Sequence, residues 1–86
     1  MTDISIANPE ARGLDGVAFT GTRGGAAHSF LVPREALEDV EYTMLETADA
    51  MLDAFGRLQD RVAQEAARAL DAGRTGTPIV IDTLVS

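Results

Sequence analysis

Hydrophobic and polar residues alternate in two neighbouring stretches of the chain. Val17 and Phe19 share one face of the first stretch, and a period of two is typical of a half-buried strand. The second stretch, residues 26–32, places three residues on one face: His28, Phe30 and Val32. The glycine-rich segment 21–25 between them can adopt the positive φ angles of a tight turn. The pattern predicts a β-hairpin.

Two further strands are predicted near the ends of the sequence. Ile4 and Ile6 alternate with polar residues, in a short strand expected to end before residues 8–9, which are Asn-Pro. Residues 10–16 have the composition of a loop. The last strand is predicted at residues 79–81, with two apolar residues following it: Leu84 and Val85.

A helix is predicted after Pro33, because the missing N–H of proline has no partner to lose in a first helical turn. Three apolar residues then keep helical spacing: Leu37, Val40 and Met44. The helix is expected to bend or restart between Tyr42 and Thr47. Thr43 and Thr47 are the candidate N-caps of the segment that follows.

A second, long helix is predicted up to Gly73, a residue suited to end it. Its apolar stripe consists of Met51, Phe55, Leu58, Val62 and Ala69. A span of roughly 25 residues would be about 37 Å long, which exceeds what a thin core requires. We therefore expect Met44, Met51, Phe55 and Leu58 to form the core, and a second chain to cover any excess of the stripe.

The order of predicted elements, β-β-β-α-α-β, favours an α+β fold. It comprises a small, mostly antiparallel sheet with two helices packed on one face. The sequence has 86 residues, so we expect residues 1–86 to form a single small domain.

Composition narrows the function classes. The chain contains no cysteine, which excludes disulfides, zinc–thiolate sites and thiol chemistry. No apolar run is long enough to span a bilayer. The first residues resemble no export signal, so we expect a cytoplasmic protein without membrane partners.

The net charge of −7 is concentrated in one segment, because acids and arginines balance on both sides of it. We call residues 35–53 the acidic segment. Its carboxylates are Glu35, Glu38, Asp39, Glu41, Glu46, Asp49 and Asp53. Such a negative field repels phosphate backbones, so direct binding of nucleic acid is not expected.

Several stretches resemble the small bacterial family called domain of unknown function 1488. They are Gly-Val-Ala-Phe at 16–19, Phe-Leu-Val-Pro-Arg-Glu-Ala-Leu-Glu-Asp at 30–39, Leu-Asp-Ala-Phe at 52–55, residues 57–66 and the closing strand. The resemblance implies a compact α+β fold with a few strands and two helices. It brings no established activity, cofactor or partner. Pro33 stands where family members often have serine.

The sequence gives little support for the common kinds of catalytic or cofactor site. His28 and Ser29 are adjacent in a strand, so their side chains point to opposite faces and cannot form a catalytic pair. A cation site requires oxygens that converge. The first four carboxylates of the acidic segment fan outward along a helix instead, and the last three share a face at spacings where they mostly repel. The glycines at 21–25 lack the spacing of a phosphate-binding loop. No metal or cofactor is predicted.

Charged residues on the long helix are the candidate binding residues. Arg57, Arg61 and Arg68 follow one helix edge and could hold carboxylates or a phosphate. Alternatively, they pair locally with three acids: Asp53, Asp60 and Glu65. On the acidic side the candidate partner-binding residues are Glu46, Asp49 and Asp53.

Three hypotheses follow. The first is a non-enzymatic, acidic cytoplasmic interaction module that self-associates, as a homodimer for example, or docks on a protein partner. The second is a small subunit that binds an anionic ligand, or assists an enzyme, through His28 and the arginine row, which consists of Arg57, Arg61 and Arg68. The third is an acidic decoy that occupies a nucleic-acid-binding protein.

Overall fold

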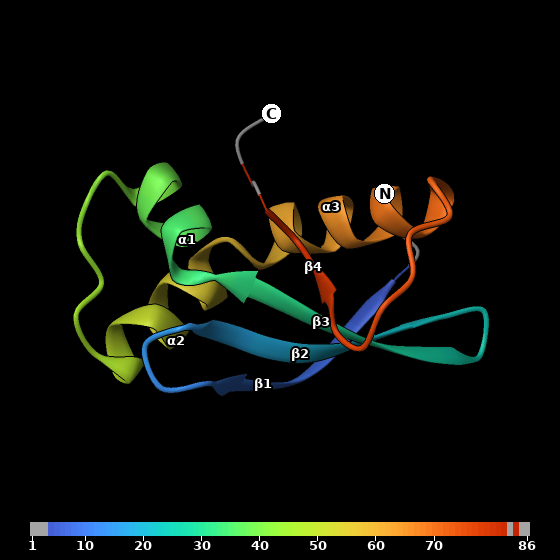
Figure 1. Cartoon of the computed structure of the whole chain (residues 1–86), viewed down its shortest axis with the longest axis horizontal. Helices are drawn as coiled ribbons and strands as arrows, with labels where there is room; N and C mark the ends of the chain where they lie inside the picture. The colour runs from blue at the N-terminus through green and yellow to red at the C-terminus, as the bar shows by residue number, and fades with distance from the viewer. Residues whose placement is uncertain (1–3, 83, 85–86) are drawn as a thin grey trace.

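The predicted hairpin is the centre of the sheet. It consists of β2 (Gly16–Arg23) and β3 (Ala26–Pro33) in the computed structural model, which describes residues 4–82 and 84 (Figure 1). The strands pair along their whole lengths, from Gly16 opposite Pro33 to Arg23 opposite Ala26. The turn is therefore only residues 24–25, two glycines with φ of 59° and 82°, which suits a two-residue hairpin turn. It is shorter than the turn predicted at 21–25.

The first strand is longer than predicted and irregular. β1 (Ser5–Ala11) pairs antiparallel with β2, and its register shifts between Ala7 and Glu10. The prediction that it ends before residues 8–9 was wrong, because a bulge absorbs these residues. Asn8 takes a φ of 55° there, a conformation that asparagine tolerates. Pro9 is acceptable because β1 is an edge strand.

The last strand completes the sheet on its other side. β4 (Ile79–Val80) runs parallel to β3, and the strand order is β1-β2-β3-β4. Pairing continues for one bond beyond it, because the N–H of Ile81 donates to the carbonyl of Leu31 at 2.8 Å. Leu84 is buried, whereas Val85 lies outside the described residues. The predicted α+β class with a mostly antiparallel sheet is confirmed.

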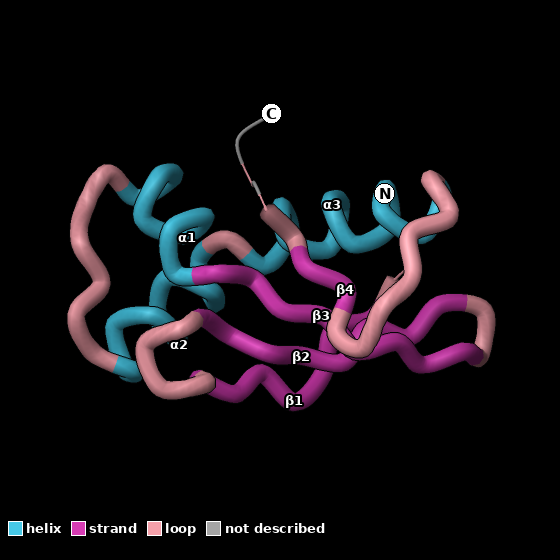
Figure 2. Tube along the Cα trace, viewed as in Figure 1, coloured by secondary structure: helices cyan, strands magenta, loops and turns pink. Residues whose placement is uncertain are grey.

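Three helices pack against one face of the sheet in the described residues (Figure 2). They are α1 (Arg34–Glu41), α2 (Ala48–Arg57) and α3 (Gln59–Asp71). Three phenylalanines join the two layers: Phe19 stacks on Phe30 with ring centroids 5.1 Å apart and meets Phe55 of α2 at 5.3 Å. The core is therefore one layer of side chains between sheet and helices.

The single long helix was a wrong prediction. The chain bends at Leu58 (φ −103°, ψ 13°), which divides the predicted helix into α2 and α3. A straight helix of about 37 Å would exceed the molecule's longest dimension of 34 Å. The bend lets Met51, Phe55 and Val62 all reach the same core, where they are buried. The buried part of the stripe is thus covered within one chain.

Met44 was also wrongly assigned to the core. α1 ends at Tyr42, so Met44 lies in the connection to α2, where it is 73% exposed. Leu45 is buried in its place. The break itself falls in the predicted interval, and Thr47 rather than Thr43 caps α2, its hydroxyl accepting the N–H of Ala50 at 3.0 Å.

Within the described residues, no helix combines the length and the apolar character needed to cross a membrane.

Candidate functional site: the acidic connection between two helices

The acidic segment covers α1, the connection to α2 and the first half of α2. Two of its acids stabilise the fold from half-buried positions. Glu41 forms an ion pair with Arg57 at the end of α2. Glu38 accepts the N–H of Leu45 at 2.8 Å, and its Oε2 lies 3.7 Å from Nε of Arg34. These contacts hold the connection against both helices.

The other five acids have no such role. All are exposed, and in residues 4–82 and 84 none forms an ion pair or a hydrogen bond through its carboxylate: Glu35, Asp39, Glu46, Asp49 and Asp53. We call them the free acids. Like charges four residues apart on one helix repel, but Glu35 and Asp49 lie in the first turns of α1 and α2, where the helix dipole favours an acid. The candidate residues Glu46, Asp49 and Asp53 all belong to this group.

Tyr42 is the most conspicuous residue of the connection. It ends α1 in the left-handed conformation, with φ of 54° and ψ of 36°, and its N–H donates to the carbonyl of Glu38 at 2.8 Å. Glycine or asparagine normally occupies such a position, because a side chain there costs energy. Tyr42 is 93% exposed, so packing within the described residues does not explain its presence.

Replacing Tyr42 with glycine is expected to raise the free energy of unfolding by about 0.5–1 kcal/mol, because it relieves the left-handed strain. Tyr42→Ala keeps the strained conformation and loses little packing, so it should match the original protein. Thermal melts of the three proteins provide the measurement, at about 4–8 °C per kcal/mol. Equal melting temperatures for the glycine and alanine variants would show that the position is unstrained.

The bend at Leu58 divides the arginine row between two helices. Arg57, on α2, pairs with Glu41, whereas Arg61 and Arg68 lie on α3. Nη1 of Arg61 approaches the carbonyl of Leu84 at 3.4 Å, and Nη1 of Arg68 lies 3.5 Å from Oε1 of Glu65. Of the three predicted local pairings, only the one with Glu65 forms.

The arginines of the row line two separate hollows. A hollow of about 290 Å³ is lined by Arg57, Leu58, Asp60, Arg61 and Gln64. Another, of about 280 Å³, has Arg68 and Arg74 on its wall together with Glu65 and Asp82. Each hollow therefore contains acids beside its arginines, which weakens its attraction for an anion.

His28 and Ser29 point to opposite faces of the sheet, as predicted. His28 is half-buried on the helix side, with its ring edge-on to Phe30 at a centroid distance of 6.4 Å. Ser29 lines a hollow on the opposite face. The two side chains do not form a catalytic pair.

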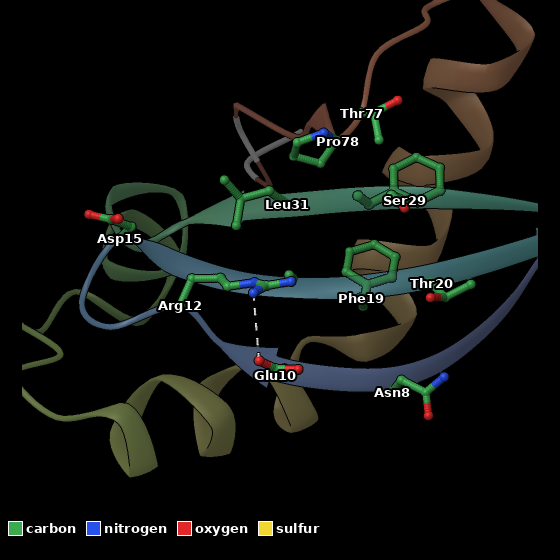
Figure 3. A pocket seen from close by; sticks show the side chains of 12 residues that line it. Asn8, Glu10, Arg12, Asp15, Phe19, Thr20, Ser29, Leu31, Thr77 and Pro78 are labelled. Atoms are coloured by element: carbon green, nitrogen blue, oxygen red, sulfur yellow. Dashed lines mark ion pairs between the residues drawn. The ribbon is translucent and has the colours of Figure 1, made fainter.

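A hollow of about 540 Å³ lies on the face of the sheet away from the helices (Figure 3). Its floor is the outer face of β2 and β3, and the Thr77–Pro78 segment forms one wall. Glu10 and Arg12 form an ion pair of 3.7 Å at one end. The sequence pattern places Thr20 and Ser29 on this face, but hydroxyl residues there are equally typical of a solvated sheet surface. The hollow was therefore not predicted.

Among the described residues, no group of three histidine or acidic side chains is arranged to hold a metal ion.

Comparison with known proteins places the chain by its fold. It resembles a crystal structure, at 1.60 Å resolution, of a protein of unknown function of the DUF1488 family from Shewanella loihica PV-4. The TM-score is 0.80 at 13% sequence identity, and the match covers 96% of each chain. No curated protein matches. The family model described as "Protein of unknown function (DUF1488)" matches residues 13–81. The resemblance noted from the sequence motifs is thereby confirmed: the chain belongs to the DUF1488 family.

Proposed function

We propose that this chain acts by binding rather than by catalysis, as a cytoplasmic module that docks on a protein partner through its acidic segment. The observation that carries the proposal is the division among the seven acids. The two half-buried ones, Glu38 and Glu41, have partners in the fold, whereas the exposed free acids have none in the described residues. Exposed carboxylates without partners in the fold are suited to meet cations of another molecule.

Docking on another protein has more support than self-association. The acidic segment would repel a second copy of itself. The edges of the sheet are also protected. β1 carries a bulge and Pro9, and β4 is two residues long, with Nη2 of Arg74 donating to the carbonyl of Val80 at 2.7 Å. Bulges, prolines and short edge strands are features that hinder pairing between sheets.

The alternative, an anionic-ligand site on the arginine row, has less support. Its strongest observation is the hollow shared by Arg57 and Arg61. However, each guanidinium of the row already contacts an oxygen of this chain, and the row is divided by the bend at Leu58. A ligand would have to compete with these contacts.

The test neutralises three free acids in one variant, Glu46→Gln with Asp49→Asn and Asp53→Asn. Tagged protein is used to capture partners from native lysate at moderate salt after nuclease treatment, and the recovered partner is then purified. We expect its affinity to fall by at least about tenfold, because several complementary charges are lost together.

The matched control is Asp15→Asn with Asp60→Asn and Asp82→Asn, three exposed acids outside the acidic segment. It changes the net charge by the same amount, so it should retain the affinity. An equal loss in both variants would indicate a general charge effect and contradict the proposed docking surface. Recovery of the tagged protein alone would also count against docking on a partner.

A further inference from the structure

The connection between α1 and α2 exposes two large apolar side chains close together. Tyr42 is 93% exposed and Met44 is 73% exposed. Single exposed apolar residues are common on protein surfaces. Tyrosine and methionine, however, are enriched in the centres of protein interfaces, and tyrosine is among the residues that most often dominate binding energy.

Tyr42 occupies its position against the preference of the backbone. Its left-handed conformation, with φ of 54°, would suit glycine better. Its ring projects into solvent, so the fold gains little packing from it. A residue that costs stability and packs on little in the described part of its own chain is explained if it packs on another molecule.

The exposed pair is held on a firm support. Leu45, next to Met44, is buried, and its N–H donates to the carboxylate of Glu38. Thr47 caps α2 through the N–H of Ala50. Contacts on both sides of the pair thus fix the connection before any partner arrives, which reduces the entropy lost on binding.

The charges on the same segment of the chain indicate the chemistry of the partner. The free acids lie on α1, in the connection and on α2. We propose that Tyr42 and Met44 are the anchors with which this chain docks on a basic protein surface, in an apolar socket bordered by arginine or lysine. The inference rests on the proposed function and specifies its central contacts. Arginine is favoured on the partner because its guanidinium also stacks on a tyrosine ring.

The sequence supplies a spectroscopic probe for this contact. Tyr42 is the only tyrosine and there is no tryptophan, so intrinsic emission above the phenylalanine range reports on Tyr42. Two synthetic peptides of identical arginine, leucine and alanine composition serve as ligands. One forms an amphipathic helix with leucines on a single face, and the other has the same residues scrambled so that no apolar face forms.

We expect the amphipathic peptide to bind at least about tenfold more tightly than the scrambled one. It should also protect Tyr42 from quenching by acrylamide, a neutral quencher that the charges of the two molecules neither attract nor repel. Tyr42→Gly and Tyr42→Ala should both weaken binding by about tenfold, measured by calorimetry, although only the glycine variant melts higher. The control is Ala26→Ser beside the β2–β3 turn, at the opposite end of the molecule from the α1–α2 connection (Figure 1). It should leave the affinity unchanged.

Equal affinity for the two peptides, or unchanged affinity in both Tyr42 variants, would overturn the inference. The proposed acidic docking surface would be unaffected, but Tyr42 and Met44 would not be its anchors. Binding of neither peptide would overturn the assignment of a basic, apolar ligand. The proposed function is decided separately, by the neutralised variant and its control with the captured partner.

Discussion

Phe30→Ala is expected to reduce the free energy of unfolding by about 3–5 kcal/mol. The ring is fully buried and stacks on Phe19, and its residue pairs with Ile79 of β4. Removing it leaves a cavity where the sheet meets the helices. A protein of this length has a total stability on the order of 5–10 kcal/mol, so the loss is a large fraction. Urea unfolding, with the slope compared between variants, provides the measurement.

The neighbouring substitution Leu31→Ala is the control for Phe30→Ala. Leu31 lies on the opposite face of the same strand and is half-buried, so its loss should cost about 1 kcal/mol or less. The comparison tests the assignment of the two faces of β3. If Leu31→Ala cost as much as Phe30→Ala, the outer face of the sheet would have to be covered in solution.

The hairpin could be predicted because its determinants are local. The alternation in residues 17–20 and 26–32 fixes which side chains point toward the core, and two glycines between them allow the turn. Partners in such a hairpin are near in sequence, so the register follows from the turn. The turn predicted at residues 21–25 was too long, however, and the observed pairing runs from Gly16–Pro33 to Arg23–Ala26 with only residues 24–25 in the turn.

The departures from prediction depend on distant parts of the chain. The bulge near Asn8 forms in the pairing of β1 with β2. The bend at Leu58 lets the apolar stripe of the two helices pack on a core that is shorter than one straight helix would be. The periodicity through Leu58 does not reveal where a helix must turn. Met44 continued a helical spacing, but α1 ends two residues earlier at Tyr42.

The candidate site could be predicted only in outline. Charge along the sequence identifies the acidic segment, because the acids and arginines balance elsewhere. It does not reveal which acids have partners. Arg57 pairs with Glu41, sixteen residues away, and not with Asp53, which is only four residues away. Nor does it reveal that Tyr42 ends a helix in a strained conformation. Both facts depend on how α1 and α2 pack together.

Two glycine-to-alanine substitutions are expected to change stability in opposite directions. At Gly16, a Cβ atom would lie 2.2 Å from the carbonyl oxygen of Val32 and 2.9 Å from Cα of Pro33. Both are backbone atoms of the paired strand, and the φ of 156° is also unusual for other residues. The central hairpin would have to separate at this point. We expect a loss of about 3 kcal/mol or more.

Gly56→Ala is the substitution with which Gly16→Ala is compared. Gly56 is exposed within α2, and a Cβ atom there would meet nothing within 4 Å. Alanine should therefore stabilise the protein by about 0.5–1 kcal/mol, because it restricts the unfolded chain and favours the helix. Thermal and urea unfolding of the two variants measure the difference. Stabilisation by both substitutions would show that the close contact of Gly16 with β3 does not limit the fold, whereas destabilisation by both would contradict the expectation for Gly56.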